Sequence, residues 1–207
     1  MKVVTDPKEY SELVRKPYAL FEYKMDRMYR VESTPVGLFV AAKNNSGDGW
    51  FQYRLPKMPA GILKAIMRFF RHIAEDLHTE VLVRVYFDPI SNSYLLEVPE
   101  QEVTAHSVET KDALLEGIYP VMDIHSHCEY SAFFSYIDDR DEVGNRLYGV
   151  IGDNLERPQF RLRAGTGGCF VELEKPYDVF DMDDIDGEEW FDYLFDRMCQ
   201  LENYSCV

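Results

Sequence analysis

The sequence predicts an α/β fold in which helices flank a mixed β-sheet, and three observations support this prediction. Residues 59–77 carry apolar side chains at helical spacing. Short apolar segments of strand character follow between residues 79 and 173, separated by turn residues. A second helical run at residues 111–118 divides these strands into two groups. An order of helix, strands, helix and strands is typical of an α/β domain.

Composition and charge narrow the class of protein. The 207 residues, 46% of them hydrophobic, suit one sizeable folded domain, with or without a smaller appended element. A net charge of −15 repels phosphates, so we expect no nucleic-acid partner and no anionic membrane surface. Four cysteines without a CxxC pair indicate reduced thiols. The first ten residues lack the apolar core of a signal peptide, and we expect a cytoplasmic protein.

Residues 1–58 are expected to form a β-rich N-terminal extension. Strands are predicted at residues 21–31, 36–43 and 50–56, with a tight turn at the sequence NNSGDG. A helix then begins near Pro59, a residue suited to the first helical turn, and runs to Leu77.

The predicted α/β domain covers residues 59–175. After the long helix, the sequences TEVLVRVYFDP and SNSYLLEVP predict a hairpin whose turn is DPISNS. The later strands are predicted at residues 119–127, 147–153, 159–166 and 167–173.

Residues 176–207 are expected to form an acidic helical segment. Between Glu172 and Glu202 the chain carries twelve acidic and two basic residues. Within this segment, apolar side chains from Trp190 to Leu201 recur at helical spacing. Two readings stay open: a helix docked on its own domain, or a docking helix for a basic partner.

A possible metal site lies at residues 125–138. His125 and His127 are one residue apart, and alternate side chains of a strand share a face, so both imidazoles can bind one ion. Ser135 and Asp138 follow at a spacing that puts both on one face of a helix. Two imidazoles and one carboxylate leave the fourth position of tetrahedral Zn²⁺ open for water, as in catalytic zinc sites.

Two alternatives compete with the metal site, one structural and one catalytic. The pattern Ser-x-x-Asp at a helix start is a capping box in its own right, which would make Ser135 and Asp138 structural. Cys128 beside His127 suggests a Cys-His nucleophile, but adjacent residues on a strand point to opposite faces.

The pattern HSH-x7-S-x2-D, residues 125–138, resembles the signature of the JAMM (MPN/JAB) metallopeptidases. The stretches FFSYIDDRDEVGNRLYGVIG and RLRAG resemble more narrowly the bacterial branch of PRTRC system protein A. The resemblance covers residues 59–173, extends loosely to the N-terminal extension, and excludes the acidic segment. It implies a JAMM-type mixed sheet flanked by helices.

The resemblance also implies roles for individual residues. His125, His127 and Asp138 match the ligands of one zinc ion with a bound water, and Ser135 matches the residue that hydrogen-bonds the oxyanion. The family places a general-base glutamate at the start of the strand after the first long helix, which selects Glu80 over its rival Glu32.

The sequence departs from the family at two positions. Val83 stands where many members have glycine, and Cys128 stands where many have proline. Neither departure removes a metal ligand.

The implied function is a zinc-dependent metallopeptidase or isopeptidase acting on the C-terminal tail of a ubiquitin-like protein. Two alternatives remain: a non-catalytic MPN-type scaffold or binding module, and a metallohydrolase of a small amide. The oligomeric state stays open.

Overall fold

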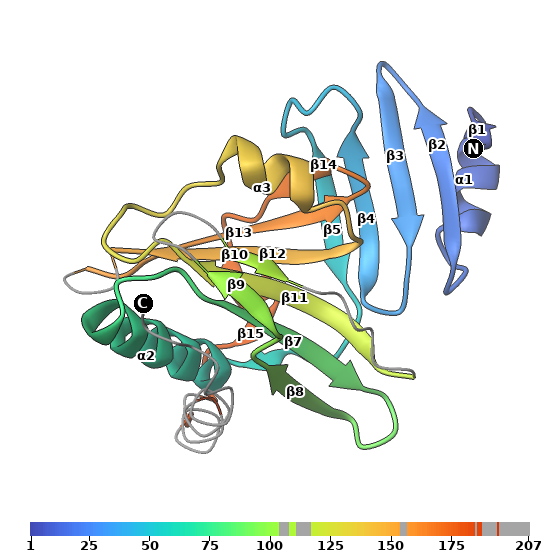
Figure 1. Cartoon of the computed structure of the whole chain (residues 1–207). Helices are drawn as coiled ribbons and strands as arrows, with labels where there is room; N and C mark the ends of the chain where they lie inside the picture. Colours follow the sequence, from blue (N-terminus) through green and yellow to red (C-terminus); the bar gives the residue numbers. More distant parts are fainter. Residues whose placement is uncertain (104–107, 111–116, 154–156, 185, 188–193, 195–207) are drawn as a thin grey trace. The chain divides into compact units, whose positions relative to one another are not determined.

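The computed structural model describes residues 1–103, 108–110, 117–153, 157–184, 186–187 and 194 (Figure 1). Its helices are α1 (Pro7–Leu13), α2 (Ala60–Asp76) and α3 (Tyr136–Asp141), with a 3₁₀ turn at Pro176–Asp178. The strands are β1 (Val3–Val4), β2 (Ala19–Lys24), β3 (Met28–Ser33), β4 (Gly37–Ala42), β5 (Gly49–Tyr53), β6 (Met58–Pro59), β7 (Leu82–Asp88), β8 (Ser93–Glu97), β9 (Gln101–Val103), β10 (Val108–Thr110), β11 (Tyr119–Ser126), β12 (Arg146–Gly152), β13 (Gln159–Thr166), β14 (Cys169–Glu172) and β15 (Phe180–Asp181). The mixed α/β class is confirmed, and the JAMM-type arrangement stays a prediction.

The strands form two larger sheets and two pairs. One sheet has the order β1-β2-β3-β4-β5, and the other has the order β14-β13-β12-β11-β7-β8 (Figure 1). In the second sheet, β7 runs antiparallel to both β11 and β8, and β13 runs antiparallel to β14. The pair β9 and β10 is antiparallel, and the pair β6 and β15 is parallel.

The chain divides into two compact units. One unit comprises residues 1–56, 134–148 and 162–178, and the other comprises residues 57–133, 149–161 and 179–207. The units interleave along the chain, whereas the sequence predicts the consecutive segments 1–58, 59–175 and 176–207. The division into those three segments stays a prediction.

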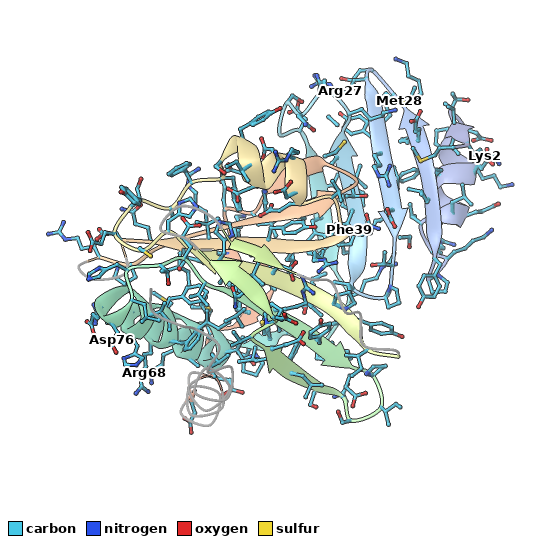
Figure 2. All side chains as sticks on the ribbon, in the orientation of Figure 1. Lys2, Arg27, Met28, Phe39, Arg68 and Asp76 are labelled. Carbon is cyan, nitrogen blue, oxygen red and sulfur yellow. The ribbon has the colours of Figure 1, made fainter. Side chains whose placement is uncertain are left out.

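The N-terminal sheet contains two more strands than predicted, β1 and one that results from a division of the first predicted strand. The expected strand at residues 21–31 is two antiparallel strands, β2 and β3, joined by a turn in which the Met25 nitrogen donates to the Arg27 carbonyl. Figure 2 labels Arg27 and Met28 at this turn. The prediction of one strand was wrong because the turn contains no glycine, proline or asparagine.

Helix α1 was not predicted. Asp6 caps it by accepting a hydrogen bond from the Lys8 nitrogen at 2.8 Å, and Pro7 begins its first turn. Tyr10 and Leu13 pack against the buried residues of β1 to β4. The Asp-Pro pair is the sequence signal that could have revealed this helix.

Helix α2 confirms the predicted apolar stripe. Ile62, Ile66, Phe69, Phe70 and Ile73 are buried. Arg68 and Asp76 are exposed on the opposite side of the helix (Figure 2). Among the described residues, no helix has both the length and the apolar character needed to cross a bilayer.

The predicted hairpin of the second sheet is present, and β13 and β14 form another. The DPISNS turn connects β7 to β8. Gly167 and Gly168 connect β13 to β14 with φ angles of 55° and 76°, a left-handed conformation that favours glycine.

The start of the C-terminal segment packs on the beginning of α2. β15 pairs with β6, and the Gly61 nitrogen, which has no partner within its helix, donates to the Asp184 carbonyl at 2.9 Å. Leu194 is helical and fully buried. The rest of the predicted acidic helix, and most of the helical run predicted at residues 111–118, lie outside the described residues.

Replacing Gly61 by alanine tests this packing. Helix propensity alone predicts that Gly61→Ala stabilises the protein by up to about 1 kcal/mol. An added Cβ would instead overlap the backbone carbonyl of Asp186. We therefore expect a loss of about 1–3 kcal/mol, measured by urea unfolding.

Lys64→Ala, at an exposed position of the same helix, is the control and should leave the midpoint nearly unchanged. A Gly61→Ala protein more stable than wild type would show that Asp184, Asp186 and Gly187 do not pack on α2.

Candidate metal centre

The two histidines lie where β11 ends. His125 belongs to the strand and lies opposite Leu82 of β7. The His127 nitrogen donates to the Ile151 carbonyl at 2.8 Å, so the chain continues beside β12 for one more residue pair. Both imidazoles are on one face because the residues are two apart in extended backbone. The side chains are buried, with exposed fractions of 5% and 6%.

The distance between the two imidazoles fits a zinc ion. The Nε2 atoms of His125 and His127 are 3.2 Å apart. A tetrahedral zinc ion with Zn–N distances of about 2.0–2.1 Å separates two ligand nitrogens by about 3.3 Å. The two nitrogens are therefore spaced as ligands of one ion.

Asp138 offers the third ligand. Its carboxylate and the two imidazoles each provide an atom, and these atoms lie within 4.8 Å of one another. His125, His127 and Asp138 thus form a cluster that could bind a metal ion. Two nitrogens and one carboxylate oxygen suit zinc and leave one coordination position for water or substrate.

Ser135 and Asp138 also form a capping box at the start of α3. The Asp138 nitrogen donates to the Ser135 hydroxyl oxygen at 3.2 Å, and the Ser135 nitrogen donates to Asp138 Oδ2 at 2.5 Å. The structural alternative is therefore present, and it is compatible with the metal reading. The box fixes the Asp138 side chain through Oδ2, while the Ser135 hydroxyl hydrogen remains able to donate.

The orientation of His127 is set by its neighbours in the following loop. Its Nδ1 lies 3.3 Å from the Ser131 carbonyl, an arrangement in which Nδ1–H donates and Nε2 keeps its lone pair for a metal. The Phe133 ring packs edge-on against the imidazole, with 4.8 Å between centroids. These contacts hold the ring in the tautomer that a ligand needs.

The loop that carries Ser131 is held against the end of β12. The Tyr130 nitrogen donates to the His127 carbonyl, and the Asp153 nitrogen donates to the Tyr130 carbonyl. Gly152 permits this close approach, since an added Cβ would lie 2.5 Å from the Ser131 carbonyl carbon and would overlap its neighbours' backbone. Sequence reasoning missed Gly152 because its partner lies twenty positions away.

Glu80 lies beside the histidines in the strand register. The Ser126 nitrogen donates to the Val81 carbonyl, and the Val81 nitrogen donates to the Ser126 hydroxyl, each at 3.0 Å. Continued by two residues, the register that pairs His125 with Leu82 places Glu80 opposite His127 on the same face. Its side chain is buried, with 7% exposed. This is a position from which a carboxylate can reach a water at the ion.

The rival Glu32 is engaged elsewhere, in the N-terminal sheet. It accepts hydrogen bonds from Asn145 Nδ2 at 2.5 Å and from Thr166 Oγ1 at 3.0 Å, and its carboxylate lies 3.6 Å from Arg30. Burial raises the pKa of this carboxyl, and the hydrogen bond from Thr166 opposes the rise. These contacts describe a structural carboxylate within a polar cluster.

Cys128 is a poor nucleophile in this environment. Its thiol donates to the Thr79 carbonyl at 2.8 Å. Burial, reinforced by the Glu80 carboxylate, raises the pKa of Cys128 to about 11, so the thiol is protonated at neutral pH. The φ angle of 47° at Cys128 is also one that proline cannot adopt.

The next residue pair along this face is an ion pair. Asp123 accepts two hydrogen bonds from the Arg84 guanidinium, at 2.8 and 3.2 Å, and Arg84 is 2% exposed. Val83 points to the other face and is fully buried.

Comparison with known proteins assigns no family. No family model matches the chain, and no curated protein sequence matches it significantly.

Gly152→Ala tests whether the loop after His127 sets the metal affinity. We expect a displaced Ser131 carbonyl and a loss of zinc affinity of about 10- to 100-fold, the usual cost of disturbing the partner of a ligand histidine. Competition with a chromophoric chelator measures this affinity.

Gly149→Ala, on the same strand, is the matched control because its Cβ would meet the side chains of Ile124 and Phe160. It should lower stability and keep the affinity. Equal zinc affinity in Gly152→Ala and wild type would contradict this role of the loop.

Proposed function

We propose that the protein is a zinc-dependent peptidase or isopeptidase. One observation carries the proposal: two buried imidazole nitrogens 3.2 Å apart, clustered with the Asp138 carboxylate. Three protein ligands with an open fourth position are the pattern of catalytic zinc, whereas structural zinc sites use four protein ligands.

The chemistry follows from the residues around the cluster. When bound, zinc lowers the pKa of water toward about 7 and polarises a carbonyl oxygen. Glu80 accepts the proton of the attacking water and delivers it to the leaving amine nitrogen. The Ser135 hydroxyl donates to the developing oxyanion, a contribution of about 3 kcal/mol by comparison with other single donors.

A polypeptide tail suits this site better than a small amide. Tyr130 and Phe133 are large apolar side chains that are about half exposed, and Phe133 contacts His127. Such surface beside a metal ligand can bind the side chains that flank a peptide bond. The resemblance to JAMM enzymes specifies the tail further, as the C-terminal segment of a ubiquitin-like protein in the cytoplasm.

Metal analysis tests the site. We expect purified protein to contain close to one zinc per chain, and His125→Ala to lose it, because a ligand is removed. His72→Ala, a histidine on α2 paired with Asp76, is the control and should keep the metal. Full zinc content in a variant lacking both His125 and His127 would refute the assignment.

The general base is tested separately, because Glu80 is proposed to move protons and not to ligate. Glu80→Gln should keep one zinc and lose hydrolysis of a tailed ubiquitin-like protein by about 10²- to 10⁴-fold. Glu32→Gln, which changes a partly buried carboxylate, should retain turnover.

If Glu80→Gln keeps wild-type turnover and Glu32→Gln loses it, Glu32 is the general base. Zinc binding without hydrolysis of any peptide would favour the non-catalytic scaffold. Hydrolysis of small amides alone would favour a metallohydrolase of a small amide.

A further inference from the structure

Arg163 is a buried charged residue that neither the motif nor the proposed mechanism uses. It lies in β13, and its side chain is 5% exposed. An arginine this deeply buried is costly unless its charge and its hydrogen-bond donors are satisfied. The side chains that contact Arg163 therefore identify the part of the molecule whose position it fixes.

The guanidinium binds two acids of the α3 region. Nη1 donates to Asp139 Oδ1 at 2.6 Å, while Nε and Nη2 donate to Glu142 Oε2 at 2.9 and 2.6 Å. Asp139 lies in the first turn of α3, and Glu142 is the residue at its C-terminal cap. Figure 1 shows α3 beside β13. One side chain thus bridges both ends of the helix.

Two aromatic rings enclose the same guanidinium. Its carbon Cζ lies 3.9 Å from the centroid of Phe134 and 3.7 Å from that of Phe170. Phe134 directly precedes Ser135, the N-terminal cap of α3. Cation–π contacts with a planar guanidinium add to the ion pairs and restrict where the start of the helix can lie.

Helix α3 cannot hold its place alone. It has six residues and no buried side chain, and helices this short are unstable without tertiary contacts. The contacts with Arg163 fall just before the helix, within it and at its end. The placement of Ser135 and Asp138 therefore depends on this arginine.

We propose that Arg163 is a positioning residue of the metal centre, which fixes α3 and with it the Asp138 ligand and the Ser135 hydroxyl. This inference rests on the proposed zinc site. It requires that losing the guanidinium changes the coordination of the ion, and not only the stability of the fold.

The test compares the zinc affinity of Arg163→Met with that of wild type, using Zn²⁺ and a competing chelator. We expect a loss of about 10- to 100-fold, as for partners that orient metal ligands. The visible spectrum of the Co²⁺-loaded protein should also change, because a displaced Asp138 alters the ligand set.

Arg54→Met is the matched control. Arg54 also binds several groups of its own unit, including the Ser33 hydroxyl and the Val14 carbonyl, but it makes none of the described contacts to α3. It should lower the melting temperature and leave the zinc affinity and the cobalt spectrum unchanged.

A second pair of variants covers the case in which Arg163→Met does not fold. Arg163→Lys keeps the charge but cannot bridge both acids or stack as a plane, so a partial loss of affinity is expected. The double variant Asp139→Asn with Glu142→Gln keeps the arginine and should lose affinity as well.

The outcomes separate the two proposals. If wild-type protein binds no zinc, the proposed function fails, and the inference fails with it. If wild-type protein binds zinc and the folded Arg163 and acid variants match its affinity and cobalt spectrum, only the positioning role is overturned.

Discussion

The register between β7 and β11 decides which side chains can meet at the end of this strand pair. His125 lies opposite Leu82, and the hydrogen bonds between Ser126 and Val81 carry the pairing past the end of the strand. A shift by one residue would turn both histidines to the other face of the sheet. The two proposed histidine ligands and Glu80 depend on this one alignment.

Around this alignment, separate contacts fix each proposed ligand. The Ser131 carbonyl orients His127. Gly152, which has no Cβ, allows the loop that carries Ser131 to lie close to β12. The capping box orients Asp138, and Arg163 holds the helix that carries it. A three-ligand zinc site needs such support because its open position contributes no protein contact that would hold the ligands in place.

Local periodicity made part of the fold and the site predictable. The apolar stripe of α2 repeats every three to four residues, and the two histidines are spaced by the exact period of a strand. The Ser-x-x-Asp spacing likewise fixed a helix start, since a capping box needs only four consecutive residues.

What the sequence did not reveal depends on residues far apart in the chain. The bond from Arg163 to Asp139 spans 24 positions, and no spacing rule connects them. The contacts of Glu32 were also out of reach of any spacing rule, because Thr166, which donates a hydrogen bond to Glu32, lies 134 positions away. The turn at residues 25–27 was missed for a different reason: Asp26 is its one residue with a turn preference, and no glycine or proline accompanies it.

X-ray absorption at the zinc edge of the purified protein tests the central claim most directly. A centre built from His125, His127, Asp138 and water predicts only nitrogen and oxygen neighbours, at about 2.0–2.2 Å, with the scattering pattern of two imidazoles. A sulfur neighbour at about 2.3 Å would contradict the account, because it would place a cysteine on the ion.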